Sequence, residues 1–182
     1  MDDVTLLVQA RGGDQAAFAQ LVERHRTHVW AVCLSTTGNR HDAEDALQNT
    51  LIAAWQHLDR FRGEARFGTW LHRIAVNNAL MVVRSRKPDT DLTDFTDADV
   101  SVTLTDDGPG FDESIATRDE LRSALARLPE DFRTALILRE FGDLTYADIA
   151  EHQGVGVQTV KSRLNRARRQ LAQILGESTR GS

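Results

Sequence analysis

The sequence contains one cysteine, three prolines and a single tyrosine among 182 residues. The lone thiol, Cys33, excludes an internal disulfide and any multi-cysteine zinc site. His25 and His28 precede it, but Cys33 lies off the helical stripe that the two histidines share. A buried thiol on an apolar helix is therefore favoured over a metal site. We predict no metal and no cofactor.

Long apolar runs are also missing from the sequence. No segment approaches the roughly 18 consecutive apolar residues that a membrane-spanning helix needs. The first residues, MDDVTLLVQARGGD, carry acidic rather than basic side chains before a short apolar stretch, which is unlike a secretory signal. We expect a cytoplasmic protein with no direct membrane insertion. No strand-like alternation of useful length occurs either, so the helical spacing of apolar residues predicts an all-α fold.

Catalytic motifs are absent as well. The sequence has no phosphate-binding GxxxxGK loop, no HExxH zinc motif and no nucleophile elbow. A kinase or a hydrolase therefore has no residues with which to carry out its chemistry. We expect a protein that is not an enzyme.

The formal net charge of −5 comes from one segment. Residues 1–87 hold 11 Lys and Arg against 9 Asp and Glu, and residues 118–182 hold the same numbers. Residues 88–117 hold no basic residue and 9 acidic residues. Low hydrophobicity with high charge of one sign favours an extended linker in this segment. The charge pattern thus divides the chain into two small helical domains joined by an acidic flexible linker.

The stretch from Leu144 to Leu171 predicts a helix-turn-helix. Gly154 stands at the turn, where a positive φ is needed. The inward positions of the two helices are small or aliphatic: Ile149, Ala150, Val155, Val160 and Leu164. The second helix carries Lys161, Arg163, Arg166, Arg168 and Arg169 and no acidic residue up to Leu171. A solvated basic helix is the alternative, but the packing pattern favours DNA binding.

The first domain contains two further helices with distinctive faces. Asp14 is a plausible N-cap for a long helix, and a second helix is expected from near Asp42. Its outer face carries polar residues around Ile52, which fits a protein-docking face and a solvated face equally well. A third helix is expected from about Thr69, and one of its stripes carries Trp70, Arg73, Asn77, Met81 and Arg84. An aromatic ring among basic and amide side chains can bind single-stranded nucleic acid by stacking on bases and pairing with phosphates. Burial of Trp70 in the core is compatible with that role.

These stretches, in this order, resemble the extracytoplasmic-function (ECF, group 4) sigma factors of bacterial RNA polymerase, members of the sigma-70 family. DAEDALQNTLIAAW resembles the core-binding helix of the family, and FRGEARFGTWLHRIAVNNAL resembles the segment that melts and reads the −10 element. RLPEDFRTALILREFGDLTYADIA and GVQTVKSRLNRARRQL resemble the domain that reads the −35 element. The resemblance implies a sigma2-like domain at residues 1–87, the acidic linker at residues 88–113 and a sigma4-like helix-turn-helix domain at residues 114–182.

The resemblance also implies roles for individual positions. The polymerase-binding residues are expected to be Glu44, Asp45, Gln48, Asn49 and Ile52. The residues that contact single-stranded −10 DNA are expected to be Arg62, Phe67, Trp70, Arg73, Asn77 and Arg84. The residues that contact duplex −35 DNA are expected to be Thr159, Lys161, Ser162, Asn165, Arg166 and Arg169.

The partners implied are core RNA polymerase, through the coiled coil of its largest subunit and its flap, and promoter DNA. The family further implies an anti-sigma factor and a role in a stress or envelope response. The alternative function is a stand-alone helix-turn-helix regulator, a repressor or activator that binds its operator without polymerase. The outward acidic face around Asp45 and Gln48 argues against that alternative.

Overall fold

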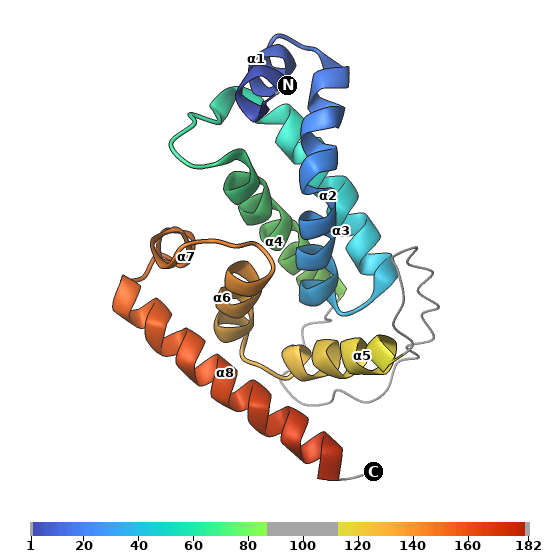
Figure 1. The fold of residues 1–182 in the computed structure, drawn as a ribbon, viewed down its shortest axis with the longest axis vertical. Helices are drawn as coiled ribbons and strands as arrows, with labels where there is room; N and C mark the ends of the chain where they lie inside the picture. The colour runs from blue at the N-terminus through green and yellow to red at the C-terminus, as the bar shows by residue number, and fades with distance from the viewer. Residues whose placement is uncertain (1, 87–112, 181–182) are drawn as a thin grey trace.

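The computed structural model describes residues 2–86 and 113–180, and these are almost entirely helical (Figure 1). The elements are α1 (Asp3–Arg11), α2 (Gln15–Thr37), α3 (Arg40–Gln56), the 3-10 helix η1 (Leu58–Arg60), α4 (Phe67–Arg86), α5 (Glu113–Ala126), α6 (Glu130–Glu140), α7 (Tyr146–Gln153) and α8 (Val157–Arg180). No strand occurs in these two stretches, which confirms the all-α prediction. Apart from Glu113, the first residue of α5, the predicted linker at 88–113 lies outside the described residues.

Helices α2 and α3 begin and end at residues that satisfy their terminal backbone groups. The Asp14 carboxylate accepts from the backbone N–H groups of Ala16 and Ala17, as predicted for an N-cap. Gly38, at φ 80°, ends α2, and the Asn39 side chain caps α3. The expected start of α3 near Asp42 is wrong by two residues, because Asn39 rather than the acidic first turn sets the boundary.

The N-terminal body, α1–α4, has its core where α2, α3 and α4 pack against one another. Small residues on α3 and α4, including Ala46, Ala54, Ala75 and Ala79, are fully buried and let the three helices approach closely. Helix α1 packs on α2. This short helix was not predicted, although Asp2 caps it by accepting from the N–H of Thr5. Helix α4 begins at Phe67, two residues before the expected Thr69, and Phe67 is buried in the core.

The C-terminal body is formed by α5–α8, with α6 and α7 packed on the long α8. Leu136, Ile137, Leu144, Val160 and Leu164 are buried where these helices meet. Pro129 is the N-cap of α6, which begins at Glu130; its place just ahead of an acidic helix start favours a position in the first turn on sequence alone, and the structure puts it one residue earlier. This position suits proline equally well, because the missing N–H would have no partner within the helix.

The two bodies touch along α2 and α4. Helix α6 contacts both of these helices, and α5 contacts α2, so α6 lies beside α4 in Figure 1. The hydrophobic cluster is continuous through this contact. The polar face of α4 therefore lies next to the helix-turn-helix.

Within the described residues, no helix has the length and apolar character needed to cross a membrane. The same part of the chain holds no group of three or more His, Cys, Asp or Glu side chains arranged to bind a metal ion.

Candidate nucleic-acid and polymerase interfaces

Helices α7 and α8 form the predicted helix-turn-helix. Thr145 and Asp148 form a capping box at the start of α7, with each side chain accepting a backbone N–H of the other residue. Gly154 ends α7 at φ 65°, the left-handed conformation that the sequence required of it. Val160 and Leu164 on α8 are buried against the domain core. The opposite surface of α8 is thereby fixed toward solvent.

The basic residues of α8 between Val157 and Leu171 fall into two groups. Arg163 donates from Nη1 to Oε1 of Gln153 at 2.9 Å, and its Nη2 lies 3.4 Å from Oδ2 of Asp131. Arg168 pairs with Glu140 at 3.0 Å, which raises the pKa of the Arg168 guanidinium. Lys161, Arg166 and Arg169 are exposed and form no ion pair with another described residue. Only this second group is fully available to an external anion.

All six residues expected at the −35 element are exposed on α8: Thr159, Lys161, Ser162, Asn165, Arg166 and Arg169. A helix that presents short polar side chains among unpaired cations can reach base edges and the phosphates that flank them. The sequence pattern did not separate Arg163 and Arg168 from the other arginines, since their acidic partners lie on α6 and at its end.

The residues expected at the −10 element lie on α4 and on the loop before it, at different depths. Asn77 and Arg84 on α4 and Arg62 on the loop are exposed, whereas Trp70 and Arg73 are half-buried. Phe67 is only 5% exposed. The Trp70 ring centroid lies 5.2 Å from that of Phe61 and 5.7 Å from that of Phe67, so these three rings form one aromatic cluster. Phe67 supports the base of the loop in this conformation, and Trp70 combines core packing with partial exposure.

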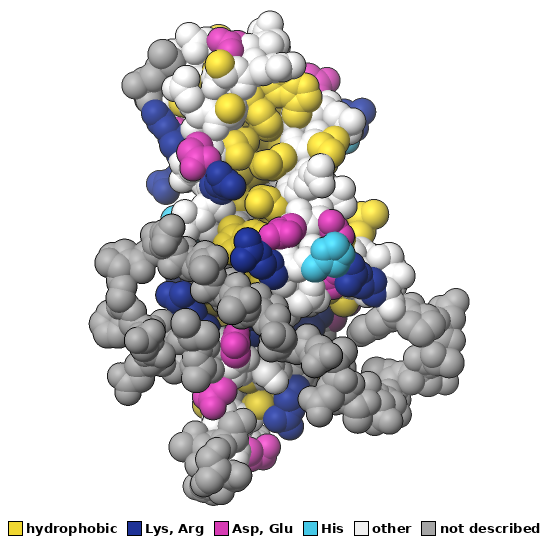
Figure 2. Space-filling view, turned by 90° about the vertical axis from the view of Figure 1, so that its right-hand side faces the viewer, with side chains coloured by type: hydrophobic (Ala, Val, Ile, Leu, Met, Phe, Trp, Pro, Cys, Tyr) yellow, Lys and Arg dark blue, Asp and Glu magenta, His cyan; other side chains and the backbone are white. Residues whose placement is uncertain are grey.

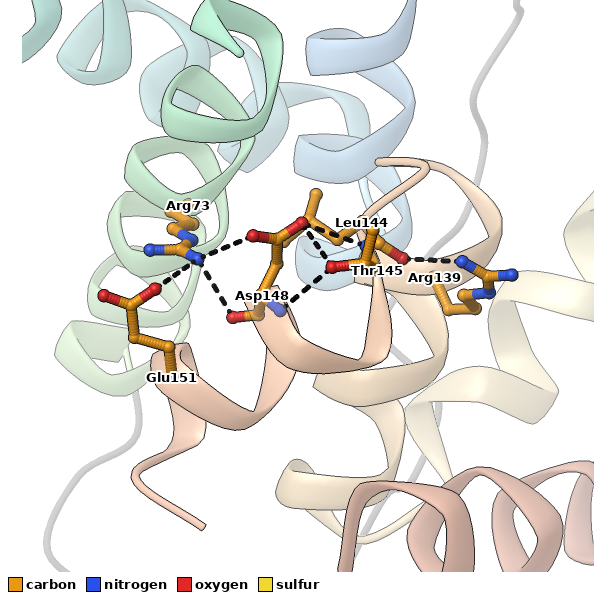
Figure 3. Close-up of polar contacts among 6 residues, drawn as sticks. All are labelled: Arg73, Arg139, Leu144, Thr145, Asp148 and Glu151. Carbon is orange, nitrogen blue, oxygen red and sulfur yellow. Dashed lines mark hydrogen bonds and ion pairs between the residues drawn. The ribbon is translucent and has the colours of Figure 1, made fainter. Parts of the chain in front are cut away.

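Arg73 reaches across from α4 to the helix-turn-helix, and sequence reasoning missed its partners. Its Nη2 donates to Oε2 of Glu151 at 3.0 Å and to Oδ1 and the backbone oxygen of Asp148 at 3.3 and 3.2 Å (Figure 3). Farther along α4, Arg84 pairs with Glu130 of α6. No helical period or charge run signals these contacts, because the partners are far apart in the sequence.

The outward face of α3 is mixed in character. Ile52 is 48% exposed, a high value for a large aliphatic side chain, and Glu44, Gln48 and Asn49 around it are exposed. Figure 2 faces the side of the molecule on which α3 lies and shows a strip of hydrophobic side chains with charged groups below it. A partly apolar surface ringed by polar groups is typical of a protein-docking site.

Arg86, the last residue of α4, forms ion pairs with two aspartates near the start of α3. Its Nη1 lies 2.5 Å from Oδ1 of Asp42, whose side chain is only 6% exposed, and its Nη2 lies 3.8 Å from Oδ2 of Asp45. The buried Asp42 carboxylate is therefore compensated by a cation. Asp45 keeps a side-chain exposure of 48% and remains available to a partner.

Two buried titratable groups have strongly shifted pKa values. Burial, and then the charges of His25 and His28, lower the pKa of His72 to about 4. Burial raises the pKa of Cys33 to about 12, and a hydrogen bond with Thr50 partly opposes that shift. The imidazole and the thiol are thus both uncharged near neutral pH.

Comparison with known families agrees with this division of the chain. Residues 21–88 match the model for Sigma-70 region 2, and residues 118–171 match the model for Sigma-70, region 4. The ECF RNA polymerase sigma factor SigW of Bacillus subtilis is 31% identical over 178 residues, which cover 92% of this chain and 93% of SigW. The ECF RNA polymerase sigma-E factor of Haemophilus influenzae is 38% identical over 175 residues, covering 92% of each chain.

The chain belongs to the extracytoplasmic-function (ECF) RNA polymerase sigma factors of the sigma-70 family. It is therefore a sigma factor and not a stand-alone helix-turn-helix regulator. Proteins of this family are initiation factors of transcription rather than catalysts.

Solved structures of ECF sigma factors share the fold. CnrH, solved in complex with the cytosolic domain of CnrY, has a TM-score of 0.71 and 27% identity, covering 96% of this chain and 97% of CnrH. The sigma factor RpoE of Bartonella quintana, solved with the anti-sigma factor NepR, has a TM-score of 0.70 and 27% identity, covering 87% of this chain and 96% of RpoE.

Proposed function

We propose that this ECF sigma factor directs core RNA polymerase to promoters through three separate faces. The outward face of α3 binds polymerase, the polar stripe of α4 and its preceding loop hold the melted −10 strand, and the exposed face of α8 reads the −35 duplex. Residues 1–87 form the sigma2-like domain, residues 114–182 form the sigma4-like domain, and residues 88–113 connect them. The protein acts in the cytoplasm without chemistry of its own.

The observation that carries this assignment is that some basic side chains of α8 form ion pairs within the domain, whereas others are exposed and unpaired. Arg163 and Arg168 are held by acidic residues of their own domain, whereas Lys161, Arg166 and Arg169 are exposed. Unpaired cations on a helix of a helix-turn-helix are typical of a helix that enters the major groove. The polar neighbours Thr159, Ser162 and Asn165 then supply contacts that distinguish bases.

The α3 face supports the polymerase role in the same way. Ile52 offers an apolar centre, and Glu44, Asp45, Gln48 and Asn49 offer polar groups around it. We assign to this face the coiled coil of the largest polymerase subunit, and to the sigma4-like domain the flap. The partner proteins named for CnrH and for the Bartonella RpoE support an anti-sigma factor as a further partner. Regulation by such a factor fits a stress or envelope response.

The test of the sigma role is transcription from fragmented genomic DNA of the source organism. Purified core polymerase is used with and without this chain, and transcript starts are sequenced. Discrete new starts that share two motifs at fixed spacing are the expected result. No new starts, together with tight duplex binding by the chain alone, would contradict it.

The role of Asn77 is tested on one of the promoters so identified. Asn77→Ala removes an exposed amide and is expected to slow promoter opening, measured by permanganate reactivity, by about tenfold if one base contact is lost. Closed-complex formation, measured by gel shift, should change less than twofold. Asn78→Ala is the matched control, because the Asn78 amide donates to the Ile74 backbone oxygen within α4. Equal loss at both steps for Asn77→Ala would refute the assignment.

A further inference from the structure

Acidic residues of the C-terminal body occupy both arginines of the α4 stripe. Arg73 is held by Asp148 and Glu151 of α7 (Figure 3). Arg84 is held by Glu130 of α6. The two arginines lie about three helical turns apart on α4. The acidic groups thus engage the stripe at two separate places.

Asn77 lies between these two places and faces a hollow that both bodies line. The hollow has a volume of about 510 Å³. Asn77, Met81 and Arg84 of α4 form one wall, and Glu130, Asp131, Thr134, His152 and Gln153 form the other. A DNA strand that enters here meets two carboxylates and must separate Arg84 from Glu130. The C-terminal body therefore stands where the −10 strand is expected to bind.

Arg73 is the more deeply covered of the two arginines. Its side chain is 20% exposed, and the backbone oxygen of Asp148 is among its partners. The guanidinium uses Nη2 for its hydrogen bonds to Asp148 and Glu151 of α7. A phosphate that pairs with this group has to displace carboxylates of the same charge, so the two kinds of contact are mutually exclusive.

The polymerase-binding face is not covered in the same way. Ile52 and the Asp45 side chain are each 48% exposed on α3. Polymerase can therefore reach the α3 face of the closed form, whereas the −10 strand cannot reach Arg73. This difference in exposure sets an order for the two events.

From these contacts we infer that the acidic edge of α6 and α7, formed by Glu130, Asp148 and Glu151, is an autoinhibitory surface that occupies the −10-reading stripe of the free sigma factor. The inference rests on the proposed −10 role of that stripe. Polymerase binds the closed form through α3, and the stripe becomes available only when the C-terminal body moves off α4. The free protein is thereby kept from binding single-stranded DNA on its own.

The contact is built to be reversible. The side chains of Arg84 and Glu130 are 61% and 42% exposed, and Glu151 is 75% exposed, so water and salt reach both ion pairs and weaken them. The remaining contact is the packing of α6 and α5 on α2 and of α6 on α4. Neutralising the carboxylates should therefore shift the closed form toward the open form without unfolding either body.

The first experiment measures the separation of the two bodies in the full chain. Donor and acceptor dyes are placed at Gln20→Cys on α2 and Gln173→Cys on α8, both exposed positions. The natural Cys33 is buried, and its thiol stays unlabelled under native conditions. Glu130→Gln combined with Glu151→Gln is expected to at least double the population with low energy transfer.

The control carries the same change of net charge in the same body. Glu120→Gln combined with Glu177→Gln removes two carboxylates that do not contact α4; Glu120 is exposed, and Glu177 pairs at 3.9 Å with Arg127. This control should keep the energy-transfer distribution of the parent protein. The same distribution in all three proteins would overturn the inference.

The second experiment measures binding to a fluorescein-labelled 12-nucleotide single-stranded DNA of random sequence. The Glu130→Gln and Glu151→Gln variant is expected to bind about three to ten times more tightly than the control variant of equal charge. Affinity for core polymerase should agree within twofold between the two variants. Tighter polymerase binding by the opened variant would refute the claim that the α3 face is open in the closed form.

The outcomes separate this inference from the proposed function. Opening without a gain in DNA affinity would reject masking, and an unaltered opening rate for Asn77→Ala would then also reject the −10 role. Unchanged energy transfer, together with slower promoter opening by Asn77→Ala, would reject autoinhibition alone.

Discussion

Arg163 on α8 is tied to Asp131 on α6, with Nη2 and Oδ2 3.4 Å apart, while Arg166 one turn later is exposed to solvent. The two arginines therefore differ in role although both belong to the same basic run. Arg163 holds α8 against the rest of its domain, and it does so together with Gln153. Arg166 is free to contact DNA.

The exchange of each arginine for alanine should separate these roles. Arg166→Ala is expected to weaken −35 binding by about 1–3 kcal/mol if it contacts a base, and to change the free energy of unfolding by less than about 0.5 kcal/mol. Arg163→Ala is expected to lower the free energy of unfolding by about 1 kcal/mol, because it removes the hydrogen bond to Gln153 and the ion pair with Asp131 that this mostly covered side chain makes. Urea unfolding and fluorescence anisotropy with a −35 duplex measure the two quantities. Equal loss of stability in both variants would contradict the distinction.

His72 should make stability depend on pH. Its pKa is about 4 in the folded protein and 6.5 in an ordinary setting, so the unfolded chain binds the proton more readily between these values. Stability is then fully present above pH 6.5 and falls as the pH drops toward 4. The contribution lost between pH 7 and 5 is about 1–2 kcal/mol. Urea unfolding at several pH values is the measurement.

Two substitutions test whether His72 is responsible. His72→Phe should reduce the slope of stability against pH over this range, while His41→Asn, at an exposed position on α3, should leave the slope unchanged. A parent-like slope in His72→Phe would assign the effect to other groups.

Cys33 should resist alkylation in the folded protein. Its pKa of about 12, compared with 9.0 in the reference state, lowers the thiolate fraction at pH 8 by roughly 10³-fold, and burial adds steric protection. Iodoacetamide should therefore label it at least 10³ times more slowly in buffer than in 6 M guanidinium chloride, as measured by intact mass. Rapid labelling of the folded protein would contradict the buried position on α2.

Two glycines should respond to alanine with opposite signs. Gly154 has φ 65°, where a Cβ is strained, so Gly154→Ala is expected to lower the free energy of unfolding by about 1 kcal/mol. Gly176 lies within α8 with open space around it, so Gly176→Ala is expected to raise the same quantity by up to about 1 kcal/mol. Thermal unfolding followed by circular dichroism compares the two. Destabilisation by both changes would show that Gly176 is not in a regular helix.

Elements with strong local signals were predicted correctly from the sequence. The helix-turn-helix has a turn glycine, buried aliphatic residues at helical spacing and a basic second helix, and each of these features is set by nearby residues. The N-cap at Asp14 is set by nearby residues in the same way, because its carboxylate accepts from the N–H groups two and three residues later. Helix α1 has only nine residues and no clear apolar stripe, so its pattern was too short to identify.

Contacts between the two bodies could not be predicted. Arg73 and Glu151 are separated by 78 residues, and the sequence around either residue does not predict that the other is its partner. The burial of Phe67 depends on its position against Phe61 and Trp70, which only the folded loop provides. The ion pairs of Arg86 with Asp42 and Asp45 on α3 also join residues that are far apart in the sequence, so they could not be predicted either. Long-range pairing therefore decided which of the predicted site residues are exposed and which are covered.

The contact between α4 and the acidic edge of α6 and α7 joins two parts of a single polypeptide. The packing of the C-terminal body on α4 is then an intramolecular equilibrium. The fraction of molecules in the closed form therefore does not depend on the concentration of the protein. An inhibitor that is a separate protein dissociates as its concentration falls, because the bound fraction follows mass action. A newly made sigma factor is therefore restrained from the first copy, before any partner has reached it.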